Sequence, residues 1–257
     1  GADPMIVSLS SVRGAPGVSS WSLLLAAAWP RDHVTDRIVV EADVHGGVAG
    51  ARYGVGAAPG VAQLLSSLRG GAEAPDDVSS FARSLGRGGW LVPGPETSES
   101  AAMVWSAPGS ATNVATALAA DGRLWMLDVG RAGPATALAP VLRSSAAVVV
   151  VSLGDHASVV QLMSRVDALR DDGCERVLIA LSGEPAFPTD EIRDFCGAPV
   201  VQLPADPQLP TLAGAVWTNG RARRRAIWRR SVTAARVVSD FVAADPATTT
   251  TEVSHAG

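Results

Sequence analysis

The sequence predicts an α/β protein, a three-layer sandwich in which a mostly parallel central sheet is flanked by helices. Short apolar runs rich in valine, leucine and isoleucine alternate with helical patterns along the chain. Most of these runs carry no charge, which is typical of strands covered on both faces. Strands that alternate with helices form βαβ units, and such units build parallel sheets.

Seven strands are expected, because each of these runs is short and is not interrupted by charge. They cover residues 6–10, 37–40, 90–92, 123–127, 146–152, 176–181 and 199–203. Helices are expected between them, where the apolar pattern has helical spacing. They cover residues 19–29, 61–68, 77–85, 112–120, 135–143, 156–170 and 209–217.

The chain of 257 residues fits a single α/β domain over residues 5–244. Residues 1–4, Gly-Ala-Asp-Pro, are interpreted as a cloning remnant before a native Met5. Residues 245–257 contain four consecutive threonines and little apolar mass, which predicts a disordered tail. The apolar run at 146–151 is too short to span a bilayer.

The basic residues are unusual, because all 21 of them are arginine and the chain has no lysine. This excludes a lysine Schiff base, a serine–lysine dyad and a complete G-x-x-x-x-G-K-[ST] phosphate loop. With 25 acidic residues the net charge is −4, which argues against a wholly basic nucleic-acid coat protein. Cys174 and Cys196 are expected to be reduced thiols, and the four histidines do not form a zinc ligand set. A cytoplasmic location is therefore expected.

The first expected strand leads into the loop V-R-G-A-P-G-V-S-S at residues 12–20, and an apolar helix follows. A glycine-containing loop in this context can direct backbone N–H groups at an anion, and the helix dipole adds to the attraction. The same residues also suit an ordinary structural turn. The loop alone does not decide between these two interpretations.

The loop resembles the deviant phosphate loop of the MinD/ParA ATPases, K-G-G-x-G-K-[ST]-[ST]. The matching residues are Arg13, Gly14, Ala15, Pro16, Gly17, Val18, Ser19 and Ser20. Arg13 stands in the place of the family's first, signature lysine, and Val18 stands in the place of the second.

Five further motifs resemble the same family, in the same order, so that the resemblance covers about residues 5–220. They are V-V-E-A-D at 39–43 (a second-strand D-x-D motif), G-V-G-A-A-P-G-V-A-Q-L-L at 54–65, W-L-V-P-G-P at 90–95, L-W-M-L-D at 124–128 (the Walker B strand) and L-P-A-D-P at 203–207 (an I-P-x-D loop). The resemblance implies a P-loop NTPase-like fold. In style the sequence is most similar to the CpaE/TadZ-like branch.

The resemblance also implies roles for individual residues. Ser19 and Asp128 would hold Mg²⁺, and Asp43 would position the attacking water. The residues that would bind ATP or ADP are Arg13, Gly14, Gly17, Val18, Ser19, Ser20 and Asp206.

Four departures from the family pattern predict a degenerate site in which magnesium nucleotide binds weakly or not at all. Val18 removes a cation from the phosphates, and such charge is usually the largest catalytic contribution. Pro16 removes a backbone N–H, and Ser182 replaces an asparagine that reads adenine. Glu41, longer than the usual aspartate, is the fourth departure. Arg13, in contrast, keeps a charge that could still bind phosphate across a dimer.

The leading hypothesis is a pseudo-ATPase that acts as a localisation or assembly factor for pilus, secretion or division machinery. It would work as a homodimer with partner surfaces, in the cytoplasm or peripherally at the membrane or cell pole. Two alternatives remain open: an active or slow ATP-dependent switch, and a nonspecific DNA-binding partition protein.

An arginine cluster near the end of the domain motivates the last alternative. Its members are Arg221, Arg223, Arg224, Arg225, Arg229 and Arg230, with Trp228 among them. A helix reaching about residue 243 is expected, with Arg221, Arg225 and Arg229 on one stripe. These residues suit a DNA backbone, an anionic membrane or an acidic protein, and equally the solvated face of a docked amphipathic helix.

Overall fold

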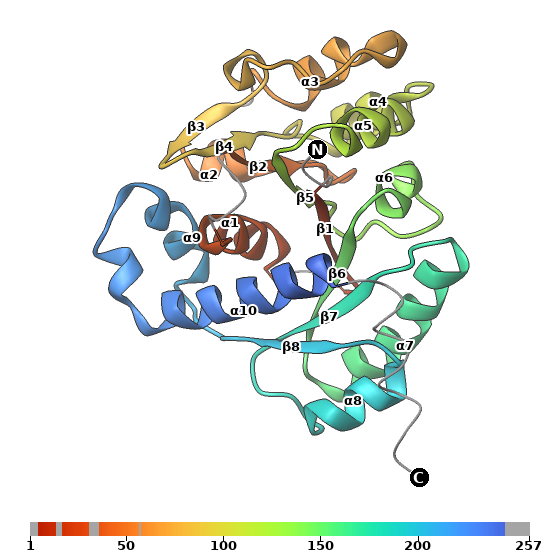
Figure 1. Cartoon of the computed structure of the whole chain (residues 1–257), viewed down its shortest axis with the longest axis vertical. Helices are drawn as coiled ribbons and strands as arrows, with labels where there is room; N and C mark the ends of the chain where they lie inside the picture. Colours follow the sequence, from red (N-terminus) through yellow and green to blue (C-terminus); the bar gives the residue numbers. More distant parts are fainter. Residues whose placement is uncertain (1–4, 14–16, 31–35, 57, 245–257) are drawn as a thin grey trace.

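The computed structural model describes residues 5–13, 17–30, 36–56 and 58–244, and these residues form one eight-stranded sheet (Figure 1). The expected remnant 1–4 and the expected tail 245–257 lie outside the described residues. The strands are β1 (Met5–Ser11), β2 (Arg37–Glu41), β3 (Arg83–Gly86), β4 (Gly89–Val92), β5 (Leu124–Asp128), β6 (Ala147–Leu153), β7 (Val177–Ser182) and β8 (Val200–Leu203). Their order across the sheet is β3-β4-β2-β5-β1-β6-β7-β8. Only β3 runs antiparallel to its neighbour, so the prediction of a mostly parallel sheet is confirmed.

Ten α-helices accompany the sheet in the described part of the chain. They are α1 (Val18–Ala28), α2 (Ala49–Arg52), α3 (Val61–Ser67), α4 (Ser98–Ser106), α5 (Ser110–Ala119), α6 (Ala139–Arg143), α7 (His156–Asp171), α8 (Thr189–Cys196), α9 (Leu209–Thr218) and α10 (Ala226–Ala243). Three short 3₁₀ turns lie at Arg69–Gly71, Val78–Ser80 and Ala222–Arg224.

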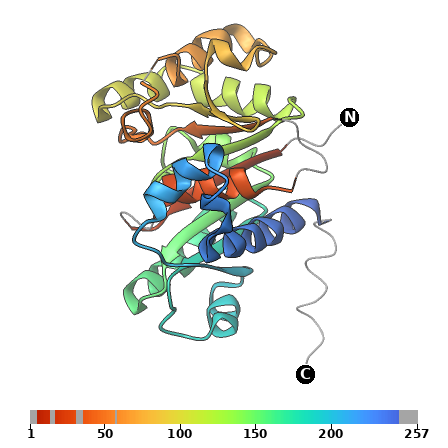
Figure 2. The same cartoon turned by 90° about the vertical axis from the view of Figure 1, so that its left-hand side faces the viewer.

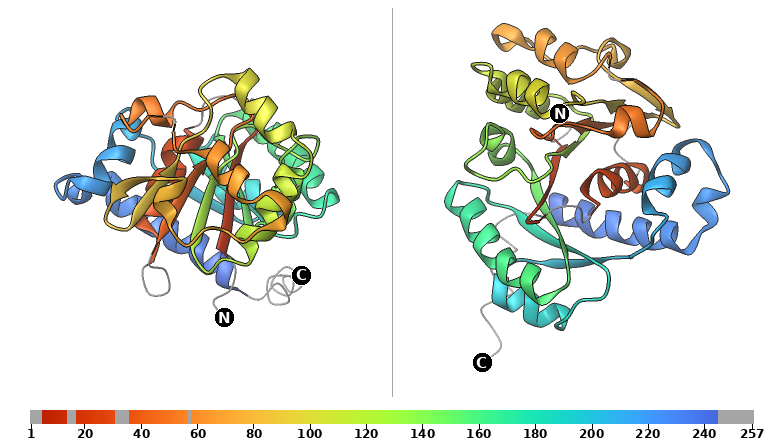
Figure 3. Two further views of the ribbon diagram at one scale, coloured as in Figure 1. Left: turned by 90° about the horizontal axis from the view of Figure 1, so that it is seen from above. Right: turned by 180° about the vertical axis from the view of Figure 1, so that it is seen from behind.

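The helices form two layers, one on each face of the sheet. Helices α1, α9 and α10 pack together on one face, and α5, α6, α7 and α8 cover the other (Figures 1 and 2). Successive residues of β5 point to opposite faces of the sheet and pack in different cores. Trp125 and Leu127 pack in the core under α5–α8, and Met126 packs in the core under α1. All three are fully buried, and burying one such side chain contributes about 1.5–3 kcal/mol. The views in Figure 3 show the same three layers from above and from behind.

The segment at 77–85 differs from the expected helix. Phe81 and Leu85 have the spacing of one helix face, but the structure forms a 3₁₀ turn at Val78–Ser80 and then strand β3. The hairpin that joins β3 to β4 explains the difference, because Gly86, Arg87 and Gly88 all have positive φ and end any helix. The prediction of a helix here was therefore wrong.

The arginine-rich segment also differs from the expected continuous helix. Arg225 has an extended backbone, with ψ of 149°, and separates the 3₁₀ turn at Ala222–Arg224 from α10. Arg221, Arg225 and Arg229 therefore do not share one helical stripe, and that expectation was wrong.

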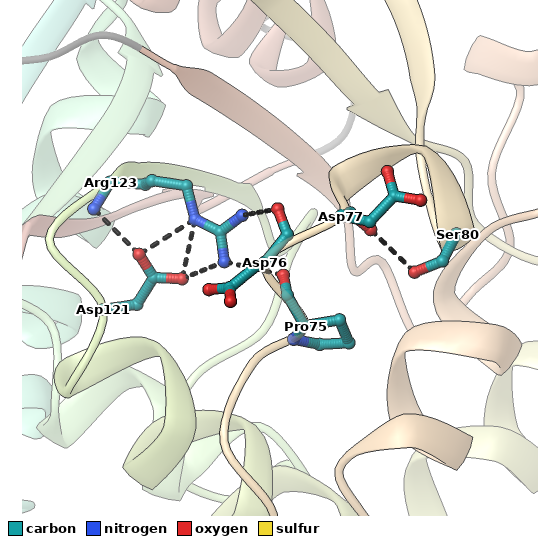
Figure 4. Close-up of polar contacts among 6 residues, drawn as sticks. All are labelled: Pro75, Asp76, Asp77, Ser80, Asp121 and Arg123. Atoms are coloured by element: carbon teal, nitrogen blue, oxygen red, sulfur yellow. Dashed lines mark hydrogen bonds and ion pairs between the residues drawn. The ribbon is translucent and has the colours of Figure 1, made fainter.

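Arg123 fastens the segment before the Val78–Ser80 turn to the start of β5 (Figure 4). Its Nε donates to both carboxylate oxygens of Asp121, at 2.9 and 2.8 Å. Its Nη2 donates to the Pro75 carbonyl at 3.0 Å, and Nη1 donates to the Asp76 carbonyl at 3.4 Å. The guanidinium also lies over the ring of Trp125, which places this fork against the buried core.

Candidate functional site

The carboxyl ends of β1, β2 and β5 meet at one edge of the sheet. In the strand register Leu9 and Glu41 both lie opposite Asp128, and the Ala42 N–H donates to the Asp128 carbonyl at 2.8 Å. Helix α1 follows β1 and begins at Val18. In open α/β sheets this edge is where ligands bind.

Asp128 is buried at this edge, with only 3% of its surface exposed. Its Oδ1 accepts a hydrogen bond from the Gly130 N–H at 3.0 Å, and the nearby Ser19 hydroxyl acts, like this bond, to lower the pKa of the carboxyl group. Burial raises the pKa of Asp128 to about 7, and the nearby carboxylates of Glu41 and Asp43 act in the same direction. The two residues expected to hold Mg²⁺ therefore lie next to each other.

Asp43 lies beside the same group. Its Oδ1 accepts from the His45 N–H at 2.9 Å, and its carboxylate rests against Gly130. A Cβ at Gly130 would lie 2.1 Å from Asp43 Oδ2, so only glycine permits this approach. The structure thus brings Ser19, Asp43 and Asp128 together, and the roles that the resemblance implies for them stay predictions.

Glu41 has a structural task that the sequence did not reveal. Its Oε1 accepts from the N–H groups of Val48 and Ala49, at 2.7 and 2.8 Å, and Oε2 accepts from Gly94 N–H at 3.0 Å. One buried carboxylate therefore joins β2 to the first residues of α2 and to the end of β4. Burial raises the pKa of Glu41, and the three backbone hydrogen bonds oppose that shift. A Cβ at Gly47 would lie 2.1 Å from Glu41 Oε2, so glycine leaves room for this carboxylate.

Val18 is the first residue of α1, and its side chain is only 7% exposed. It belongs to the same buried cluster as Leu209 and Leu212 of α9, so it contributes to the core. Gly17 caps the helix with φ of +88°, a backbone that favours glycine, and a Cβ there would approach Leu209 Cδ2 to 3.2 Å. Ser20 is buried as well, at 2% exposure.

The remaining loop residues are only partly described. Gly14, Ala15 and Pro16 lie outside the described residues. Arg13 is exposed, and its charge acts on Asp155, the residue that caps α7. Hydrogen bonds from Ser158, and then the charge of Arg13, hold the pKa of Asp155 below its ordinary value.

Asp206 caps the turn before α9. Its Oδ1 accepts from the Gln208 N–H at 2.7 Å, and its Oδ2 lies 3.9 Å from Arg225 Nη2. A member of the arginine cluster is thereby paired with the loop that resembles the family's nucleotide loop. Both side chains are partly exposed, so the pair contributes little to stability.

The arginine cluster divides into buried and exposed members. Arg223 donates through Nε to the Val216 carbonyl at 2.7 Å and lies over the Trp228 ring. Trp228 itself packs in the core at 9% exposure. The members that reach the surface are Arg221, Arg224, Arg225, Arg229 and Arg230.

At position 18, where the resemblance places a lysine, the described residues supply no cation for the phosphates of a nucleotide. The side chain of Val18 packs in the core, whereas Ser19 and Asp128 lie next to each other. Within the described ranges no three His, Cys, Asp or Glu side chains gather as a metal ligand set.

Comparison with known proteins identifies the fold. No protein-family model matches the chain, and no curated protein matches it by sequence. The cell division ATPase MinD of Pyrococcus furiosus is 16% identical, with a TM-score of 0.71 over 92% of this chain and 99% of that one. A ParA family ATPase from Chlorobium tepidum is also 16% identical, with a TM-score of 0.70 over 91% and 98%. The septum site-determining protein MinD of Pyrococcus horikoshii, solved with Mg-ADP, is 16% identical with a TM-score of 0.69 over 91% and 95%.

These similarities show that the chain has the MinD/ParA P-loop NTPase fold. In the described part of the chain, no helix combines the length and the apolar character needed to cross a bilayer.

Proposed function

We propose that this chain is a MinD/ParA-like protein that does not hydrolyse ATP and that acts as a localisation or assembly factor. The buried side chain of Val18 is the observation that carries the proposal. Preorganised charge at the transferring phosphates is usually the largest contribution to such catalysis, and removing one donor lowers the rate by about 10²–10³ in other systems. Val18 supplies no charge and stabilises the α1–α9 side of the core instead.

The proposed factor works through protein surfaces, as a homodimer in the cytoplasm or peripherally at a membrane or cell pole. Pilus, secretion and division machineries are the candidate settings, in line with the CpaE/TadZ-like style of the sequence. MinD of Aquifex aeolicus, 12% identical with a TM-score of 0.67 over 92% and 96%, was solved in complex with MinC. This fold therefore supports a partner surface, which suits a role in assembly.

Localisation in the host cell tests the proposal. We expect the full chain, carrying a fluorescent tag, to occupy a discrete membrane or polar position. Asp43→Ala removes the water-positioning carboxylate of an active site, and we expect it to leave that position unchanged. An even distribution of the wild-type chain, or loss of its position in Asp43→Ala, would overturn the proposal.

An ATP-dependent switch is a second candidate, favoured by the meeting of Ser19, Asp43 and Asp128. Arg13 would then be the cation that remains to grip the phosphates. This candidate predicts saturable ATP binding by calorimetry, and weaker binding in Arg13→Ala. Absence of binding at millimolar nucleotide rejects it.

Nonspecific DNA binding is a third candidate, favoured by the five exposed arginines of the cluster. It predicts that the logarithm of the DNA-binding constant falls linearly with the logarithm of the salt concentration, with a slope of about −0.9 for each phosphate that the protein neutralises. Arg229→Ala should reduce that slope by about one unit. Binding to long duplex DNA that is absent, or insensitive to salt, rejects it.

A further inference from the structure

A cavity of about 560 Å³ lies between the loop that follows β5 and helix α7, next to Val12. We name it the α7 pocket and define it by Val12, Arg131, Gly133, Val160 and Arg165. Helix α7 and the exposed arginines of α10 lie on opposite faces of the sheet (Figure 1). The pocket is therefore separate from the arginine cluster.

Two guanidinium groups line the α7 pocket. Arg165 is half-buried, and its Nη1 donates to the Ala132 carbonyl at 2.9 Å. Arg131 is exposed on the opposite wall. Within the described residues, no carboxylate lies at ion-pair distance from either arginine. Burial lowers the pKa of Arg165 from its ordinary value, so the pocket contains a partly desolvated positive charge without an acidic partner.

The loop wall of the pocket is held in place before any ligand arrives. The Ala132 carbonyl accepts a second hydrogen bond, from the buried Ser10 hydroxyl of β1 at 2.7 Å. The Thr136 hydroxyl donates to the Gly133 carbonyl at 2.7 Å. A Cβ at Gly133 would lie 2.4 Å from Arg165 Nη1, so glycine makes room for the guanidinium. A preorganised wall lowers the entropy cost of binding.

The pocket also has an apolar side. Val160 of α7 is 62% exposed, and Val12 is partly buried beside it. A free inorganic anion would bind the arginines and leave this apolar surface exposed to solvent. A peptide segment that carries an acidic side chain next to an apolar one would use both surfaces.

We propose that the α7 pocket docks an acidic segment of a partner protein, in which an Asp or Glu carboxylate pairs with Arg131 and Arg165 and a neighbouring apolar side chain covers Val160. This inference rests on the proposed function, because it states which chemical groups a partner of the assembly factor would present to the pocket. Its test contains no nucleotide, so its failure would leave the proposal about ATP intact.

Selection from a library of random short peptides on the full chain tests the inference directly. We expect the selected peptides to share an Asp or Glu next to an apolar residue. In fluorescence anisotropy, Arg131→Glu and Arg165→Ala should each weaken their binding about tenfold or more, as expected for loss of a charge-assisted contact. Gly133→Ala, which displaces the Arg165 guanidinium without removing its charge, should weaken binding in the same direction.

Matched controls separate this site from general charge attraction and from misfolding. Arg236→Glu changes an exposed arginine on the other face of the sheet and should leave binding unchanged. Arg131→Glu alters an exposed side chain, so its thermal unfolding should match that of the wild type even if Arg165→Ala is destabilised. Selected peptides that lack acidic residues, or that bind Arg131→Glu as tightly as the wild type, would overturn the inference. Displacement of the peptides by inorganic phosphate or acetate at equal affinity would overturn it too, since the pocket would then be a site for free anions.

Discussion

At the scale of single residues, the candidate site combines polar side chains that meet at the sheet edge with an uncharged, buried residue at position 18. Ser19, Asp43 and Asp128 meet at the carboxyl edge of the sheet, while Val18 turns its side chain into the core. A valine at this position is a packing residue, and its effects should appear in stability.

We expect Val18→Ala to lower the free energy of unfolding by about 1–3 kcal/mol, because it removes buried apolar surface. Urea unfolding measures the change. Val48→Ala is the matched control, since Val48 is 52% exposed and its change should stay within about 0.5 kcal/mol. Equal stability of Val18→Ala and the wild type would show that Val18 does not support the core.

Asp128 should make stability depend on pH. Its pKa is about 7 in the fold and 3.8 ordinarily, so between these values the folded state binds more protons than the unfolded state. Stability should therefore fall as pH rises from about 4 to 7, and the full penalty should persist above that window. Asp128→Asn is neutral at every pH. We expect it to be more stable than the wild type at pH 8, on the order of 2–4 kcal/mol, with the advantage shrinking towards pH 4.

Thermal unfolding of both proteins across this pH range measures the effect. The raised pKa of Glu41 leaves some pH dependence in the variant, so the comparison is the difference between the two curves. A difference that does not change with pH would show that Asp128 is ionised normally in the fold.

At the scale of elements, Glu41 holds three segments together. Its carboxylate takes hydrogen bonds from the start of α2 and from Gly94 after β4, which fixes the loop that carries Asp43. The family pattern places the shorter aspartate here. The extra methylene of glutamate is what lets one carboxylate reach both neighbours.

We expect Glu41→Asp to cost about 1–3 kcal/mol, since the shorter side chain leaves at least one buried N–H without an acceptor. Chemical denaturation gives the value. Glu73→Asp makes the same change at an exposed position and should be neutral. Unchanged stability in Glu41→Asp would mean that the three N–H groups find other acceptors.

At the scale of the whole molecule, the seven expected strands all form, because uncharged β-branched runs have few alternatives to a buried strand. Strand β3 was not predicted, because Phe81 and Leu85 have the spacing of a helix face. The hairpin that follows, with positive φ at Gly86, Arg87 and Gly88, is what makes this segment a strand. Helices α2, α4 and α8 were also missed, and they are short elements of four, nine and eight residues. Short helices depend on tertiary packing more than on their own sequence pattern.

The candidate site, like the fold, could be predicted from the sequence only in part. The motif order located Ser19, Asp43 and Asp128, because strand ends determine which residues meet. The burial of Val18 and Trp228, the hydrogen bonds of Glu41 and the α7 pocket all depend on packing between distant segments. No local pattern in the sequence carries that information.

The central claim concerns the whole molecule: a MinD/ParA fold in which the position of the catalytic lysine has become part of the core. Phosphate release from ATP, measured with and without magnesium on the full chain, tests it most directly. We expect release by the wild type to be no faster than release by Asp128→Asn. Robust, magnesium-dependent release that Asp128→Asn abolishes would contradict it.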